Sequence, residues 1–111
     1  MPRVKKRYLM VRVVPPSVQV TPEELRQTVA RELERLGGWL ALAEAGISVR
    51  RAGKAADEFM LRCSLKSVPL VLLALTMVQG LKEERVRLDV TGMSGTIKGL
   101  RRFSKSLEDY S

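Results

Sequence analysis

The residues of this sequence that are best suited to chemistry are its cations, which gather near the two ends of the chain. Residues 3–7 carry four positive charges and no negative one, and residues 98–105 carry four more without an acid. The formal charge is +8 over 111 residues. Such an excess attracts polyanions, and each phosphate contact adds affinity that salt weakens. Ordinary solubilising charge is the alternative, but the concentration in two segments favours nucleic-acid binding.

A stretch rich in glycine and hydroxyl groups, Gly92–Lys98, leads into the second basic segment. Backbone amides at the start of a helix can bind an anion, and the hydroxyls of Ser94 and Thr96 add donors. The alternative is a plain strand-to-helix connection in which Ser94 or Thr96 caps the helix. The candidate RNA-binding residues are Lys5, Lys6, Arg7, Arg12, Arg62, Ser94, Thr96, Lys98, Arg101 and Arg102.

The remaining residues give little support for a catalytic site. Histidine is absent, which removes the commonest general base and metal ligand. The single cysteine, Cys63, excludes an internal disulfide, and the alternation of its strand turns it toward the core. Asp89 lies among arginines, where a carboxylate is better suited to a structural ion pair than to proton transfer. We therefore expect no catalytic residue, no metal site and no cofactor bound by the protein.

The elements that position these residues follow from the hydrophobic periodicity. Alternation predicts strands over residues 7–14, 47–51, 58–65 and 85–91. Helical spacing predicts a helix from the Thr21 cap to Gly37-Gly38, a short helical turn over 39–45, and a second helix from Ser67 to about Gln79. A short basic helix follows residue 96. This β-α-β-β-α-β order predicts one α+β domain over residues 1–111, a ferredoxin-like or RRM-like sandwich with an extra C-terminal helix.

One face of the predicted four-stranded sheet carries the helices, and the other is expected to be open. The residues placed on the open face are Tyr8, Met10, Arg12, Met60, Arg62, Arg87 and Asp89. Only one of them is aromatic, so the base stacking of ordinary RRM domains is poorly supported. The arginines either bind phosphate or a partner's acidic residues, or form ion pairs within the sheet, and both interpretations stay open.

The second helix is apolar around almost its whole circumference. A helix of this kind is buried on all sides, whereas one face is enough to cover the sheet. We therefore expect a protein partner on it, contacted through Val68, Leu72, Leu75 and Met77. The alternative is that the C-terminal helix or residues 39–45 fold over it.

No membrane attachment is expected, because the longest apolar run, residues 68–78, is shorter than the roughly 20 residues of a bilayer span. We expect a cytoplasmic protein.

Four stretches together resemble one family, ribonuclease P protein component 2, the small subunit shared by archaeal and eukaryotic ribonuclease P. They are Lys6-Arg7-Tyr8-Leu9, Leu61-Arg62-Cys63, Ala74-Leu75-Thr76-x-Val78 and Ser94-Gly95-Thr96-Ile97-Lys98. The resemblance covers residues 5–103, and the last stretch and the Arg-Cys pair are its most specific parts. Glu58 departs from it, since a glycine is expected before the third strand.

The resemblance implies an RRM-like fold and a role in 5′ maturation of precursor tRNA, with hydrolysis performed by the RNA subunit and its magnesium ions. It implies as partners the ribonuclease P RNA and protein component 3, a TIM-barrel subunit, in an assembly that can dimerise through this chain as a homodimer or heterotetramer. Two alternatives remain: another ribosome- or ribonucleoprotein-associated RNA-binding protein of this fold, and a ligand-binding or enzymatic ferredoxin-like domain.

Overall fold

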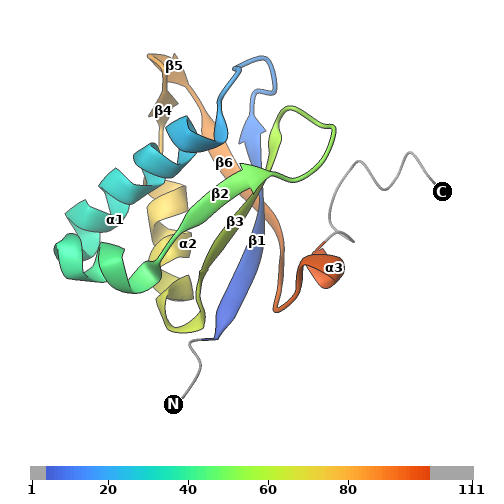
Figure 1. The fold of residues 1–111 in the computed structure, drawn as a ribbon. Coiled ribbons are helices and arrows are strands. Elements are labelled where there is room, and N and C mark those ends of the chain that lie inside the picture. Colours follow the sequence, from blue (N-terminus) through green and yellow to red (C-terminus); the bar gives the residue numbers. More distant parts are fainter. Residues whose placement is uncertain (1–4, 101–111) are drawn as a thin grey trace.

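The computed structural model describes residues 5–100, which form a four-stranded antiparallel sheet with two long helices on one face (Figure 1). The strand order is β2-β3-β1-β6. The predicted ferredoxin-like order of elements, with an additional helix after the last strand, is confirmed. The elements are β1 Lys6–Val14, α1 Pro22–Ala45, β2 Ser48–Arg51, β3 Glu58–Ser64, a 3₁₀ turn Leu65–Ser67, α2 Val68–Met77, β4 Gly80–Leu81, β5 Glu84–Arg85, β6 Arg87–Ser94 and α3 Ile97–Leu100.

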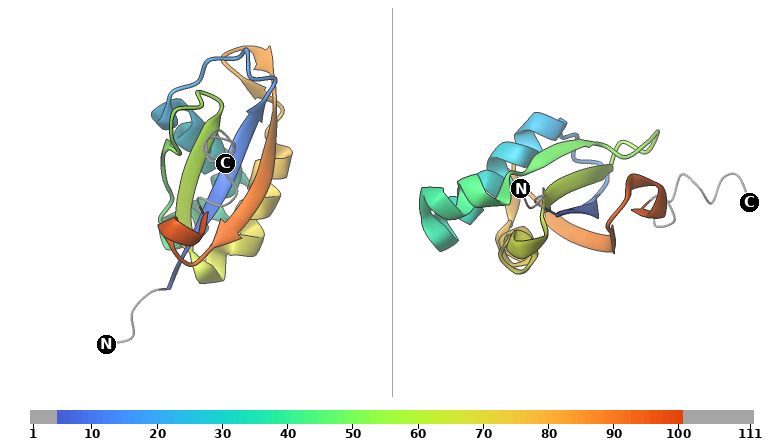
Figure 2. Two further views of the ribbon diagram at one scale, coloured as in Figure 1. Left: turned by 90° about the vertical axis from the view of Figure 1, so that its right-hand side faces the viewer. Right: turned by 60° about the horizontal axis from the view of Figure 1, so that its bottom comes forward.

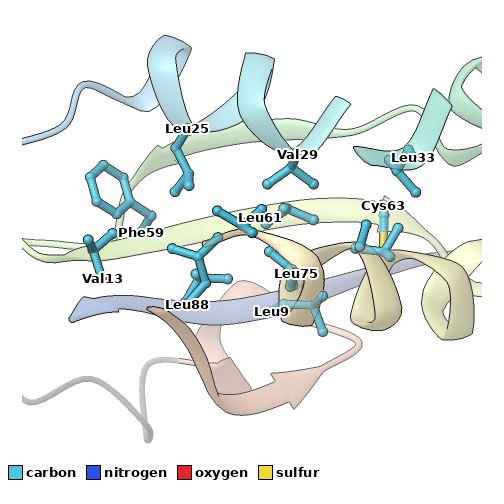
Figure 3. Close-up of a cluster of buried hydrophobic side chains, with 14 of the residues drawn as sticks. Leu9, Val13, Leu25, Val29, Leu33, Phe59, Leu61, Cys63, Leu75 and Leu88 are labelled. Carbon is cyan, nitrogen blue, oxygen red and sulfur yellow. The ribbon is translucent and has the colours of Figure 1, made fainter. Parts of the chain in front are cut away.

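The main core lies between the sheet and the helices α1 and α2 (Figure 3). Alternate residues of β1 point into it, and Leu9, Val11 and Val13 are fully buried as their alternation predicts. Helix α1 contributes Leu25 and Val29 at helical spacing. A single apolar layer therefore fixes the sheet's orientation and turns the intervening residues of β1 to the opposite face.

Helix α1 begins and bends at the residues that the sequence indicates. The Thr21 hydroxyl accepts a hydrogen bond from the Glu24 amide at 3.1 Å, and the Glu24 carboxylate accepts one from the Thr21 amide at 2.9 Å. The predicted break at Gly37-Gly38 is a kink, because Gly38 has φ +78° and leaves the helical region. The expected turn over 39–45 is therefore the second arm of one bent helix.

A two-stranded hairpin that the sequence does not predict follows α2. Helix α2 ends at Met77 instead of Gln79, and β4 then pairs with β5, joining Gly80 to Arg85. The turn between them holds Lys82 and Glu83 at φ +53° and +67°. Turns with two positive φ values usually contain asparagine or glycine, so this Lys-Glu pair gives no local signal.

The last strand is longer than predicted and extends through Gly92–Ser94, which the sequence places in a loop. These residues pair with Met10, Leu9 and Tyr8 of β1. The register shifts between Met10 and Val11, which indicates a β-bulge in β6. The pairing of an edge strand with the central β1 outweighs the weak strand propensity of glycine.

The second sheet face is partly covered, which corrects the expectation that it is open. Helix α3 lies across one end of this face (Figure 2), and its Leu100 is fully buried against Met10 and Met60. Met10 is 1% exposed and Met60 is 7% exposed. Strand alternation predicts that both lie on this face, but it does not say what covers the face.

No helix among residues 5–100 combines the length and apolar character that a bilayer crossing requires.

Candidate nucleic-acid interface

The basic start of β1 lies beside the turn that leads into α3, at one end of the sheet. Tyr8 of β1 pairs directly with Ser94 of β6, so Lys5–Arg7 lie beside the segment that leads into α3. The contact is close, since a Cβ added at Gly95 would lie 3.2 Å from the Arg7 guanidinium nitrogen Nη1. Antiparallel pairing of the first and last strands thus brings the cations of Lys5–Arg7 beside the turn that precedes Lys98, about 90 residues later in the chain.

The hydroxyls of Ser94 and Thr96 hold this turn together. The Ser94 Oγ accepts a hydrogen bond from the Thr96 amide at 3.2 Å, and the Thr96 Oγ1 accepts one from the Gly99 amide at 3.0 Å. This is the capping arrangement that the sequence left as the alternative to an anion site. Lys98 is exposed on α3. Arg101 and Arg102 lie outside the described residues.

The sheet face beside α3 presents side chains in cross-strand rows. One row consists of Ser48, Arg62, Tyr8 and Ser94, and the next consists of Arg50, Met60, Met10 and Gly92. A third row brings Glu58 beside Arg12 and Asp89. Residues opposite each other in such a row have their side chains on the same face within contact distance.

The arginines of this face divide into paired and unpaired ones. Arg12 forms an ion pair with Glu58 at 3.3 Å, and Arg87 forms one with Asp89 at 2.8 Å. Within residues 5–100, Arg62 and Arg50 have no hydrogen-bond or ion-pair partner. The two interpretations that the sequence left open therefore apply to different residues, with ion pairing at Arg12 and Arg87 and free guanidinium groups at Arg62 and Arg50.

Arg12 is the predicted RNA-binding residue that lies apart from the others. It is four residues along β1 from Tyr8, about 13 Å at the usual rise of a strand. Its partner Glu58 is fully buried, at 0% exposure. The pair therefore holds the far end of β1 against β3, and the basic surface consists of Lys5, Lys6, Arg7, Arg62 and Lys98.

Sequence reasoning missed Arg50 and Ser48 on β2. Val49 lies between them in the strand and faces inward, so strand alternation places its two neighbours on the other face. The sequence therefore contained the signal for both residues. Arg50 is exposed, whereas Ser48 is half-buried beside Arg62. The strand is only four residues long, and its outward residues become meaningful only once it is known to lie next to β3.

The predicted partner surface on α2 is only partly exposed. Val68 and Leu75 are 7% and 1% exposed and belong to the core, because they face the sheet. Leu72 is half-buried, while Met77 is 46% exposed. Leu73, at 47%, shares the exposed side of the helix with Met77 and was not predicted.

Two further apolar side chains lie on the same side of the sheet as α2. Val90 and Met93 of β6 are 37% and 48% exposed, and they pair with the core residues Val11 and Leu9. Val90 is exposed because β6 is an edge strand, whose outer flank no other described element covers. An exposed apolar group on neighbouring elements is typical of a protein contact surface.

Cys63 lies in the core beside α1 and α2 (Figure 3). Burial raises the pKa of its thiol to about 11, so the thiol is protonated at neutral pH and unsuited to nucleophilic attack. This agrees with its expected role as a small buried residue. Among residues 5–100, no three histidine, cysteine, aspartate or glutamate side chains form a group that could hold a metal ion.

Comparison with known proteins identifies similar sequences and a similar fold. The model of the Rpp14/Pop5 family matches residues 7–105. A ribonuclease P protein component 2 from Pyrococcus furiosus is 29% identical over 100 residues, covering 90% of this chain and 82% of that protein. One from Methanoculleus marisnigri is 29% identical over 107 residues, covering 95% of this chain and 64% of that protein.

A solved structure shares the fold at low sequence identity. A chain in the cryo-EM structure of yeast ribonuclease MRP superimposes with a TM-score of 0.64 and 8% identity, covering 99% of this chain and 96% of that one. At such identity the match supports the fold alone, including the placement of the helices on the sheet.

Proposed function

Because the chain belongs to the Rpp14/Pop5 family, we propose that it acts as a non-catalytic, RNA-binding protein subunit of ribonuclease P in the 5′ maturation of precursor tRNA. Family membership confirms the resemblance to protein component 2. The observation that supports the RNA-binding role is that the basic residues Lys5–Arg7 lie beside the turn into α3, where Tyr8 pairs with Ser94. Cations gathered on one surface neutralise phosphates that crowd together in a folded RNA.

The proposal assigns the hydrolysis to the RNA subunit and its magnesium ions. The protein contributes positive charge and shape, which lower the concentration of free cations that the folded RNA needs. The proposal also includes the ribonuclease P RNA as the nucleic-acid partner and a cytoplasmic location for the protein.

The proposed protein partner is component 3, and the proposed contact surface is the exposed side of α2 with its neighbours on β6. This surface consists of Leu72, Leu73, Met77, Val90 and Met93. Its side chains are apolar, and none of them carries a charge that would have to be desolvated on contact. A homodimer or heterotetramer built through this chain is part of the same proposal.

Reconstitution of precursor-tRNA cleavage tests the function. We expect the chain, together with component 3, to lower the magnesium concentration at which the ribonuclease P RNA cleaves. The control is a basic RRM-like protein of equal net charge, which should give little effect. Equal stimulation by the control, or none by this chain, would contradict the proposal.

The partner surface is tested by gel filtration with the double variant Leu73→Glu/Met77→Glu. Both residues are close to half exposed, so the double variant should fold and lose co-elution with component 3. Gln27→Glu/Arg31→Gln on exposed positions of α1 is the control, because it also lowers the net charge by two. Undiminished co-elution of the α2 variant would place the partner elsewhere.

A further inference from the structure

A groove runs between α3 and the sheet face formed by β2, β3 and β1. It comprises two cavities of about 210 and 250 Å³, which share Arg50, Met60 and Ile97 as lining residues. Tyr8, Ser48 and Arg62 complete the first cavity, and Met10 and Leu100 lie at the floor of the second. Among residues 5–100, only α3 covers this face, and it leaves the part over β2 and β3 uncovered, which forms the groove.

Every charged side chain among the described residues that line the groove is positive. Arg50 and Arg62 lie on adjacent rows of neighbouring strands, at a diagonal distance of about 7–8 Å between backbone positions. No acidic side chain is among the described residues that line either cavity. The sheet's acidic residues are occupied elsewhere, with Glu58 beside Arg12 and Asp89 beside Arg87. Two guanidinium groups without partners in residues 5–100 therefore converge on one small space.

The rest of the lining suits a flat, partly apolar group. Tyr8 is half-buried and lies directly opposite Arg62, so its ring borders the same space as the guanidinium. Met60 and Ile97 add apolar surface, and the Ser48 hydroxyl is a free donor among the described residues. Stacking on an aromatic ring, contact with apolar side chains and phosphate binding by arginine together are the requirements of a nucleotide.

We propose that this groove binds one unpaired nucleotide of RNA, with its phosphate between Arg50 and Arg62 and its base against Tyr8, Met60 and Ile97. The inference rests on the proposed function and deepens it, by naming single-stranded RNA as the ligand of this face. A cavity of about 210 Å³ beside a helix holds one nucleotide, whereas a duplex presents its bases inside the helix and offers none to stack. The mode differs from ordinary RRM stacking, because α3 occupies part of the sheet and only one aromatic residue takes part.

The experiment measures binding of an unstructured oligouridine and of a blunt RNA duplex by fluorescence anisotropy at low salt. We expect Arg50→Gln and Arg62→Gln each to weaken oligouridine binding about three- to tenfold, and Tyr8→Leu to weaken it about fivefold. Arg87→Gln is the matched control, because it removes the same charge from the same sheet but is paired with Asp89. Far-UV circular dichroism checks that each variant is folded.

Several results would contradict the proposal that the groove binds a nucleotide. They are unchanged oligouridine affinity in the Arg50 and Arg62 variants, equal loss in the Arg87 control, equal loss for the duplex, or no oligouridine binding by the unmodified chain. Tighter binding of a polyglutamate peptide, lost in the same variants, would assign the groove to a protein segment instead. Precursor-tRNA cleavage with the unmodified chain is a separate readout, so the groove and the proposed function can fail independently.

Discussion

At the scale of single residues, the arginines of the sheet differ in what surrounds them more than in their chemistry. Arg12 and Arg87 have carboxylate partners, while Arg50 and Arg62 have none among residues 5–100. The Arg12 pair also differs from the Arg87 pair in burial, since Glu58 is 0% exposed and Asp89 is 39% exposed. Removing one member of an ion pair is destabilising when the remaining charge is buried and loses that partner, whereas removing a member of an exposed pair has little effect.

We therefore predict different effects when each arginine is removed. Arg12→Ala should lower the free energy of unfolding by about 2 kcal/mol, below the range for a fully buried pair because Arg12 is one-third exposed and water screens it. Arg87→Ala, the control, should leave the urea midpoint within experimental error. Equal midpoints for the two variants would show that the Arg12–Glu58 pair does not hold the end of β1.

At the scale of elements, the short helix α3 decides how much of the sheet is accessible. It has four residues, so its own hydrogen bonds cannot keep it folded in isolation. What holds it is Leu100, buried against Met10 and Met60, together with the Thr96 cap at its start. A small apolar contact thus shields one row of the sheet and forms a wall of the groove.

The change Leu100→Ala tests this contact through the methionines beneath it. Loss of the side chain should weaken docking enough to raise the oxidation of Met10 and Met60 by hydrogen peroxide on the order of tenfold. Met77 and Met93 are 46% and 48% exposed and serve as internal controls whose oxidation should not change. Peptide mass spectrometry measures all four, and unchanged protection of Met10 would refute the docking.

At the scale of the whole molecule, the placement of charge matters more than its total. The net charge of +8 includes arginines on α1 that are paired with acids on the same helix, Arg26 with Glu23 at 2.6 Å and Arg35 with Glu32 at 3.2 Å. The cations at the start of β1 lie instead beside the turn into α3, with no acidic residue in segment 3–7. Of these two groups, the cations at the start of β1 are the ones that, within residues 5–100, present unpaired positive charge to an RNA.

Two double variants with the same net charge of +6 separate these contributions. Lys5→Gln/Lys6→Gln should reduce the slope of log affinity for ribonuclease P RNA against log salt by about 1.5, since each lost phosphate contact changes it by roughly 0.7–0.9. Arg26→Gln/Arg35→Gln should leave the slope nearly unchanged. Filter binding over a range of salt concentrations measures both, and equal slopes would mean that net charge alone governs binding.

The sequence by itself determined the order of the main strands and helices, without the β4–β5 hairpin, and it determined the family. Alternation at Leu9, Val11 and Val13 and the capping box at Thr21 are local patterns, and local patterns are set by backbone geometry that the sequence encodes directly. The resemblance around Ser94–Lys98 was carried by residue identity alone. The clustering of cations at the chain ends was also visible, because charge is a property of composition.

Only the tertiary structure decided what lies next to what. It joined Lys5–Arg7 to the turn into α3, paired Arg12 with Glu58, left Arg50 and Arg62 free among the described residues, and covered Met10 and Met60. It also moved Val68 and Leu75 from the predicted partner surface into the core. Each outcome depends on strand pairing or packing between residues far apart in the chain, and such contacts leave no periodic signal in the sequence.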